Sequence, residues 1–232
     1  APDPDRLRRD LEAVQAKVQA VEHDIVWHHD GGWKAIGLVT ADGDIEQNRL
    51  AARSRYEKTA AMAHCPYIEA FIEGLGIATR RVRLLSLAPG GRVYWHHDAT
   101  KAMDGHHDGH VARVHVPIVT AAEIDFQISH ETCVWQPGEV WWGDFSFPHR
   151  VANRSPVNRV HLVMDLVVDN AFLAMMPEWF RTQRAARIRA RRLAVTACNA
   201  WYLHREYRPR ALVRLKRRLI GSAFSRTRRA AR

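Results

Sequence analysis

Three copies of the triplet His-His-Asp occur in the chain, at residues 28–30, 96–98 and 106–108. Each contains a His-x-Asp pair, and residues i and i+2 of a β-strand project from the same face. On a strand, such a pair offers an imidazole and a carboxylate side by side to one metal ion. A second histidine from a distant strand would complete a facial triad of two histidines and one carboxylate, which is typical of non-haem iron(II) oxygenases.

The surrounding sequence favours the triplet at residues 96–98. His96 and Asp98 end a β-rich stretch that begins at a Pro-Gly-Gly turn, and His149 is available as the distant ligand. The triplet at 28–30 runs into two glycines, and the triplet at 106–108 lies in a Gly- and His-rich stretch without a strand signal. We interpret both triplets as parts of polar surface loops. The alternative that the loop at 106–108 lines the active-site cleft stays open. The predicted metal ligands are therefore His96, Asp98 and His149.

Further motifs stand in a fixed order around these ligands. They are Pro-Gly-Gly (89–91), His-x-Asp (96–98), Arg-x-His-x-Pro (113–117), Gly-Glu-x-Trp (138–141), Asp144, Pro-His (148–149) and Arg-x-His-Leu-Val-x-Asp (159–165). With this order and spacing, residues 33–169 resemble the aspartyl/asparaginyl β-hydroxylase family, including bacterial hydroxylases of free amino acids such as the proline cis-4-hydroxylases. The resemblance implies a double-stranded β-helix fold, iron(II) as the metal, and 2-oxoglutarate and O2 as co-substrates.

The resemblance also assigns roles to three more residues. Arg159, ten residues after His149, matches the family arginine that binds the distal carboxylate of 2-oxoglutarate. A planar guanidinium suits a carboxylate better than the point charge of a lysine does. Arg113 and His115, which share one face of a strand, match positions that contact the metal-proximal carboxylate in relatives. We expect all three to bind the co-substrate, and a place in the substrate pocket stays open for Arg113 and His115.

The sequence departs from the family pattern at two points. Seventeen residues separate His96 from Arg113, and the extra length, residues 99–110, is a candidate lid or substrate-selecting loop. The animal aspartyl hydroxylases lack the carboxylate ligand, whereas Asp98 is present here. The chain therefore resembles the bacterial branch with a full triad more closely.

The elements that must position these residues can be predicted along the chain. Apolar residues recur at three- and four-residue steps from Asp5 to about Glu22, which predicts a helix. A strand from Trp33, helical character over 57–62 and a second helix at 66–75 follow. From residue 80 to 169, short β-rich stretches alternate with turn signals, which is typical of a sandwich or barrel and not of a parallel α/β sheet. These patterns predict a mainly β fold with N-terminal helices and a C-terminal helical, Arg-rich extension, and the family resemblance implies that its core is a jelly-roll or cupin-like double-stranded β-helix.

The charge of the chain is unevenly distributed. Its 232 residues carry a net charge of +10, yet residues 181–232 hold 17 Lys and Arg against one acid, whereas residues 1–180 hold 18 against 24. We predict a catalytic domain at 1–176 and a basic helical extension at 177–232. Within the extension, residues 211–224 predict an amphipathic basic helix. This helix either packs on the body or docks an acidic partner such as a carrier protein, and contact with nucleic acid or anionic lipid stays open.

The amino-acid composition argues against a disulfide-rich, zinc-thiolate or membrane-spanning protein. The three cysteines, Cys65, Cys133 and Cys198, predict neither a disulfide framework nor a four-thiolate zinc site, and no stretch is apolar enough for a membrane span. We expect a cytoplasmic protein.

The predicted function is that of an Fe(II)- and 2-oxoglutarate-dependent dioxygenase. It would hydroxylate an unactivated C–H bond of an amino acid, an amino-acid-derived natural product or a peptide side chain. Two alternatives stay open: a β-barrel protein whose basic tail binds nucleic acid or an acidic partner, and a cupin-like metal protein without oxygenase activity. Nucleic acid is the less expected partner, because the basic charge is confined to the tail.

Overall fold

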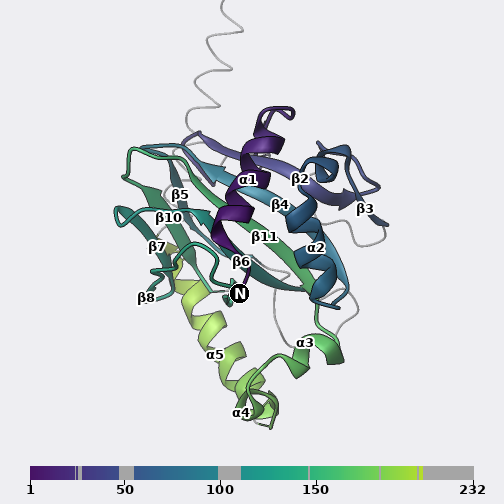
Figure 1. Cartoon of the computed structure of the whole chain (residues 1–232). Coiled ribbons are helices and arrows are strands. Elements are labelled where there is room, and N and C mark those ends of the chain that lie inside the picture. The colour runs from purple at the N-terminus through teal and green to yellow at the C-terminus, as the bar shows by residue number, and fades with distance from the viewer. Residues whose placement is uncertain are drawn as a thin grey trace, which may run out of the picture.

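Two antiparallel β-sheets face each other at the centre of the computed structural model, which describes residues 1–23, 25, 28–46, 55–98, 111–145, 147–182, 184–202 and 204–205 (Figure 1). The larger sheet has the strand order β1-β2-β4-β11-β6-β9, with β3 beside β2, and the smaller sheet has the order β5-β10-β7-β8. The strands are β1 (Val21–Glu22), β2 (Trp33–Ala41), β3 (Tyr56–Lys58), β4 (Thr79–Leu87), β5 (Arg92–His96), β6 (Val111–Val119), β7 (Ile124–Ile128), β8 (Glu131–Thr132), β9 (Trp141–Trp142), β10 (His149–Asn153) and β11 (Arg159–Val167).

The helices lie at the two ends of the chain and between β3 and β4. They are α1 (Pro4–Gln15), the 3-10 helix η1 (Ala60–His64), α2 (Pro66–Gly74), α3 (Asn170–Ala174), α4 (Glu178–Thr182) and α5 (Arg184–Tyr202). Figure 1 shows α1 and α2 across one face of the larger sheet. Helix α1 begins after Asp3, whose carboxylate accepts hydrogen bonds from two backbone amides of the first turn, with Pro4 at a position where a missing N–H costs nothing.

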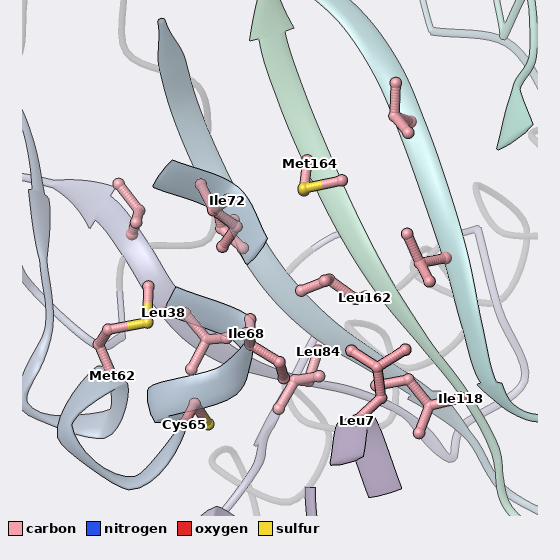
Figure 2. Packing of buried hydrophobic residues seen from close by; sticks show 14 of the residues in the cluster. Leu7, Leu38, Met62, Cys65, Ile68, Ile72, Leu84, Ile118, Leu162 and Met164 are labelled. Atoms are coloured by element: carbon pink, nitrogen blue, oxygen red, sulfur yellow. The ribbon is translucent and has the colours of Figure 1, made fainter. Parts of the chain in front are cut away.

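The main apolar core fills the space between these helices and the larger sheet. Leu7 of α1 and Ile68 of α2 are fully buried there against Leu84, Leu162 and other strand residues (Figure 2). Burying a side chain of this size stabilises the fold by about 1.5–3 kcal/mol. Helices and sheet are therefore held together by one contiguous core.

The opposite face of the larger sheet carries buried polar side chains beside a small apolar cluster of Ala35, Leu85 and Val163. Side chains alternate along a strand, so β11 divides its residues between two environments. Val160, Leu162, Met164 and Leu166 belong to the main core. Arg159, His161 and Asp165 occupy the other face and are buried between the two sheets. These polar side chains of the larger sheet therefore lie on the inner surface of the β-sandwich. A further apolar cluster, which includes Leu87, Phe126 and Trp135, packs beside them.

Two expectations for local structure are wrong. The opening helix ends at Gln15 instead of Glu22, because Val21 and Glu22 pair with β2 as an edge strand. Residues 57–62 are not helical throughout but form the end of β3 and the start of η1. The Thr59 hydroxyl donates to the carbonyl of Gly37 and accepts from the Ala61 amide, and this holds the junction in place.

The expectations for the fold class are confirmed. The chain is mainly β with a double-stranded β-helix core, N-terminal helices and a helical segment after residue 177. The strand from Trp33 and the helix at Pro66–Gly74 are also as predicted. None of the helices in the described part of the chain is long and apolar enough to cross a membrane. The boundary at residue 176 stays a prediction, and the expected helix at 211–224 lies outside the described residues.

Candidate metal centre

A register irregularity between β5 and β10 positions the two predicted histidine ligands. His149 lies directly opposite His96, whereas Val151 lies opposite Val93, so two residues of β5 (94 and 95) stand opposite the single residue Arg150 of β10. Directly opposed residues project from the same face. Both His96 and Val93 therefore point between the sheets, although strict alternation would place them on opposite faces. The imidazole centroids of His96 and His149 are 4.1 Å apart.

His96, Asp98 and His149 form a compact group of potential ligands. One donor atom from each residue lies within 4.8 Å of the other two. The Nδ1 atoms of His96 and His149 lie 2.7 and 3.0 Å from the carbonyl oxygens of Tyr94 and Phe147. A carbonyl can only accept, so each Nδ1 carries the hydrogen and each Nε2 keeps a lone pair for a metal.

The protonation states of these residues also fit a metal. Burial lowers the pKa of His96 to about 3 and lowers that of His149, so both imidazoles are neutral at physiological pH. Burial alone would raise the pKa of Asp98, but the positive charge of the Arg113 guanidinium outweighs it and holds that pKa below its usual range. Two neutral nitrogen donors and one anionic oxygen donor are the set that a divalent transition metal prefers.

Arg113 contacts the predicted carboxylate ligand directly. Its NH1 atom lies 2.6 Å from Oδ2 of Asp98, and its Nε atom lies 3.0 Å from Oδ1 of Asp165. The backbone amide of Asp98 donates to the carbonyl of Phe145, which fixes the residue just beyond the end of β5. One carboxylate oxygen of Asp98 is therefore engaged by Arg113. The expected role of Arg113 at the co-substrate stays a prediction.

Arg159 lies on the wall of a cavity of about 310 Å³. Its NH2 group is 3.2 Å from Nδ1 of His161, and its guanidinium lies over the ring of Phe126. In the described part of the chain, no carboxylate pairs with it. Burial lowers the pKa of Arg159 to about 10, so it remains a cation at neutral pH. A buried cation beside a cavity has the charge and position to bind an anionic group, and the expected role of Arg159 at the co-substrate stays a prediction.

His115 lies between this cavity and the metal ligands. Its Nδ1 atom is 3.3 Å from Nδ1 of His161, and its ring stacks on Phe145. The ring of Phe145 in turn meets that of His149 edge to face at 5.0 Å. The Nε2 atom of His115 is buried and has no hydrogen-bond partner among the described residues. The arrangement leaves His115 able to donate to or accept from a bound group, as its predicted role requires.

Of the other two His-His-Asp triplets, only the one at residues 28–30 lies within the described residues. The expectation of a surface loop is wrong for His28 and His29. His29 is buried and forms an isolated bridge with Val93, and the ring of His28 lies 4.5 Å from that of His96. The triplet at 106–108 and the candidate lid at 99–110 lie outside the described residues.

Sequence reasoning missed two contributors to this site. His28 approaches the candidate centre because its segment pairs with β5, and no local pattern indicates that pairing. Asp165 contacts Arg113 because β6 and β11 are in register at these residues. The spacing Arg159, His161, Asp165 could have indicated that Asp165 shares their face, but it could not have identified the partner.

The family model described as aspartyl/asparaginyl beta-hydroxylase matches residues 3–168. The chain belongs to this family. The match covers both N-terminal helices and all strands of both sheets. No curated protein matches the chain.

Several solved structures resemble this aspartyl/asparaginyl beta-hydroxylase family member at low identity. A 2OG-Fe(II) oxygenase family oxidoreductase from Burkholderia pseudomallei is 16% identical, with a TM-score of 0.45, and the match covers 69% of this chain and 77% of that one. A prolyl hydroxylase from Trichoplax adhaerens is 10% identical, with a TM-score of 0.45 and coverage of 75% and 82%. A prolyl-4-hydroxylase from Pseudomonas putida is 13% identical, with a TM-score of 0.37 and coverage of 72% and 88%.

Membership of the aspartyl/asparaginyl beta-hydroxylase family confirms that the chain is hydroxylase-like and confirms the expected resemblance. It does not extend to the substrate. Nothing in the described residues supports the expected carrier-protein partner.

Proposed function

We propose that this protein is an Fe(II)- and 2-oxoglutarate-dependent dioxygenase that hydroxylates an unactivated C–H bond. Its substrate would be an amino acid, an amino-acid-derived natural product or a peptide side chain. One observation carries the proposal: a group of two neutral histidines and one carboxylate lies near a cavity whose wall contains a buried arginine that no carboxylate among the described residues neutralises. Bound iron(II), together with 2-oxoglutarate and O2, would supply the oxidising chemistry.

The chain's own residues would divide the remaining work. His96, Asp98 and His149 would hold the metal through two Nε2 atoms and one carboxylate oxygen, leaving coordination positions open. Arg159 would bind the distal carboxylate of the co-substrate in the cavity. His115, between the cavity and the ligands, and Arg113, which contacts Asp98, would face the metal-proximal carboxylate.

The inner surface of the sandwich would also exclude water from the reacting atoms. Phe126 and Trp135 line the cavity, and Phe145 separates His115 from His149. These aromatic side chains lower the local dielectric, which strengthens the contact between Arg159 and an anion. The cupin-like alternative without oxygenase activity needs the metal ligands but has no need of a buried arginine at the cavity wall.

The test is turnover by the purified full chain. The protein is incubated with iron(II), 2-oxoglutarate and a panel of amino acids and peptides, and succinate and a product heavier by one oxygen atom are measured. We expect both to appear together with at least one member of the panel, and to disappear in His149→Ala. His130→Ala is the matched control, because His130 is an exposed histidine on the β7–β8 turn. Succinate formation by His149→Ala at the wild-type rate would contradict the assignment of the ligands.

A further inference from the structure

The last turn of α5 packs on strand β5 and on the residue that follows this strand. Tyr202 is 3% exposed, although most of the side chains described in α5 are exposed. Its ring meets that of His97 edge to face, with the two centroids 5.5 Å apart. The neighbouring Trp201 meets Trp95 in the same way at 6.4 Å. Figure 1 shows α5 leading back from α4 toward the smaller sheet, and these contacts attach its last turn there.

Both contacts lie on the side of β5 that faces away from the interior of the sandwich. Side chains alternate along a strand, so Trp95 and His97 project from the opposite face to His96, which lies between them in the sequence. His96 points between the sheets, toward His149. The ring of Trp95 also lies 5.3 Å from the guanidinium carbon of Arg150, which follows His149 on β10. The last turn of α5 therefore packs behind β5, and Trp95 links it to β10, the strand of the other histidine ligand.

The position of β5 in its sheet makes this contact important. In the described part of the chain, β5 is the edge strand of the smaller sheet, with β10 beside it. His29 adds an isolated bridge at Val93, toward the start of the strand. An edge strand is held by a full ladder on one side only, and proteins often cover such an edge with a helix or a loop. The end of β5 that leads into the ligands His96 and Asp98 is the end that α5 contacts.

We infer that the last turn of α5 positions the metal ligands, with Tyr202 as the positioning residue. Packed on His97, its ring holds the segment from His96 to Asp98 in the conformation that binds a metal. The inference rests on the proposed function, because it takes His96 and Asp98 as metal ligands. The family match ends at residue 168, so the inference adds a segment beyond the matched residues to the catalytic unit.

The expected size of the effect follows from the strength of the ring contact. A metal binds the fraction of molecules in which the ligands are in place, so the apparent dissociation constant rises as that fraction falls. An edge-to-face aromatic pair shifts an equilibrium about 2- to 12-fold. Loss of the contact between Tyr202 and His97 should therefore weaken metal binding by a factor in this range.

The experiment measures the affinity of the full chain for cobalt(II), without 2-oxoglutarate, by following the visible absorption of the bound ion. We expect Tyr202→Ala to raise the dissociation constant about 2- to 12-fold and to alter the absorption spectrum, because the ligand geometry is less well fixed. Tyr202→Phe keeps the ring on His97 and should show the wild-type affinity and spectrum. A loss in Tyr202→Phe as large as that in Tyr202→Ala would overturn the role of the ring.

Tyr67→Ala is the matched control. Tyr67 is a partly buried tyrosine of α2 that packs on the main core, on the far side of the larger sheet, and its hydroxyl accepts from the Asp3 amide. The control should lose stability and keep the wild-type affinity and spectrum. If Tyr67→Ala weakened cobalt(II) binding as much as Tyr202→Ala does, metal affinity would follow stability in general, and the inference would be overturned.

The outcomes separate this inference from the proposed function. If the wild-type protein binds no cobalt(II), the proposed metal site is wrong and the inference is overturned with it. If the wild type binds the ion, Asp98→Ala does not, and Tyr202→Ala binds it with unchanged affinity and spectrum, the metal site stands and the role of Tyr202 is overturned.

A second variant covers loss of folding. Trp201 is 47% exposed, so Trp201→Ala removes the contact with Trp95 at a smaller loss of buried surface. If Tyr202→Ala shows no cooperative unfolding in urea, the same cobalt(II) titration is made on Trp201→Ala. A rise of the dissociation constant by about twofold or more supports the inference that the last turn of α5 positions the ligands, and an unchanged dissociation constant overturns it.

Discussion

Replacing Arg159 by methionine tests the co-substrate site most directly. Methionine keeps an unbranched side chain of similar length in the wall of the cavity and removes the guanidinium. If Arg159 binds the distal carboxylate of 2-oxoglutarate, the variant loses a charge-assisted contact in a buried site. Such a contact is worth about 1.5–3 kcal/mol, so the dissociation constant for 2-oxoglutarate should rise about 10- to 150-fold.

The same substitution should also affect the stability of the fold, and in the opposite direction to most substitutions of a buried residue. Burial lowers the pKa of Arg159 to about 10, and no carboxylate in the described part of the chain pairs with it, so the fold disfavours its charge. Arg159→Met should therefore unfold at the same or a higher urea concentration than the wild type when no co-substrate is added. Most substitutions of a side chain that is 94% buried would lower stability instead.

Both effects can be measured on manganese(II)-loaded protein, by calorimetric titration with 2-oxoglutarate and by urea unfolding. Arg154→Met is the control, because Arg154 is exposed and lies beside Asp125 instead of the cavity. Arg159→Lys, which keeps the charge and loses the planar fork, should bind with intermediate affinity. An unchanged affinity in Arg159→Met, or an equal loss in Arg154→Met, would refute the assignment. A loss of stability above about 1 kcal/mol would show that Arg159 supports the fold instead.

Three further predictions follow from burial. Burial raises the pKa of the Cys133 thiol to about 11, so alkylation of Cys133 should be slow at pH 8 and should accelerate about tenfold per pH unit. Added 2-oxoglutarate should slow the alkylation further, because the thiol lines the same cavity. Fast labelling of Cys133 at pH 8, measured by peptide mass spectrometry, would contradict this prediction. Burial lowers the pKa of His23 and His161 well below the usual value, so the unfolded chain binds more protons below pH 6.5. The unfolding free energy of metal-free protein in urea should therefore fall by about 1 kcal/mol for each histidine between pH 6.5 and 5.5, and a flat profile would refute it. Leu162→Ala should cost about 2–5 kcal/mol in the same assay, because the side chain is fully buried in the main core, whereas Leu193→Ala on the exposed face of α5 should change stability by less than about 0.5 kcal/mol.

The parts of the fold that sequence could predict are those with a local signal. Alternation of apolar residues and turn residues gave the strands, and Pro66 marked the start of α2. The predicted opening helix was too long because Val18 and Val21 continue its helical spacing, although Val21 belongs to an edge strand. Pairing with β2 decides between the two, and pairing is a tertiary interaction.

The same limit applies to the candidate site. The pair His96 and Asp98 could be predicted because residues two apart share a face. The contacts of Arg113 could not be predicted, because they depend on which residue of β11 lies opposite Arg113. The register between two strands cannot be read from the sequence of one of them. His28 was misassigned for the same reason.

The extra residue of β5 opposite β10 has a consequence for how this strand can change over time. Val93 packs into the closed end of the sandwich and His96 faces the candidate centre, and the irregularity between them resets the phase of the strand. Substitutions at the packing end leave the orientation of the ligand end untouched. A single-residue deletion between the two would remove the extra residue and restore regular alternation, in which residues two apart share a face, so Val93 and His96 would still both point between the sheets. Point substitutions can therefore tune the two ends independently, and loss of the extra residue would shorten the strand without turning the ligand away from the candidate centre.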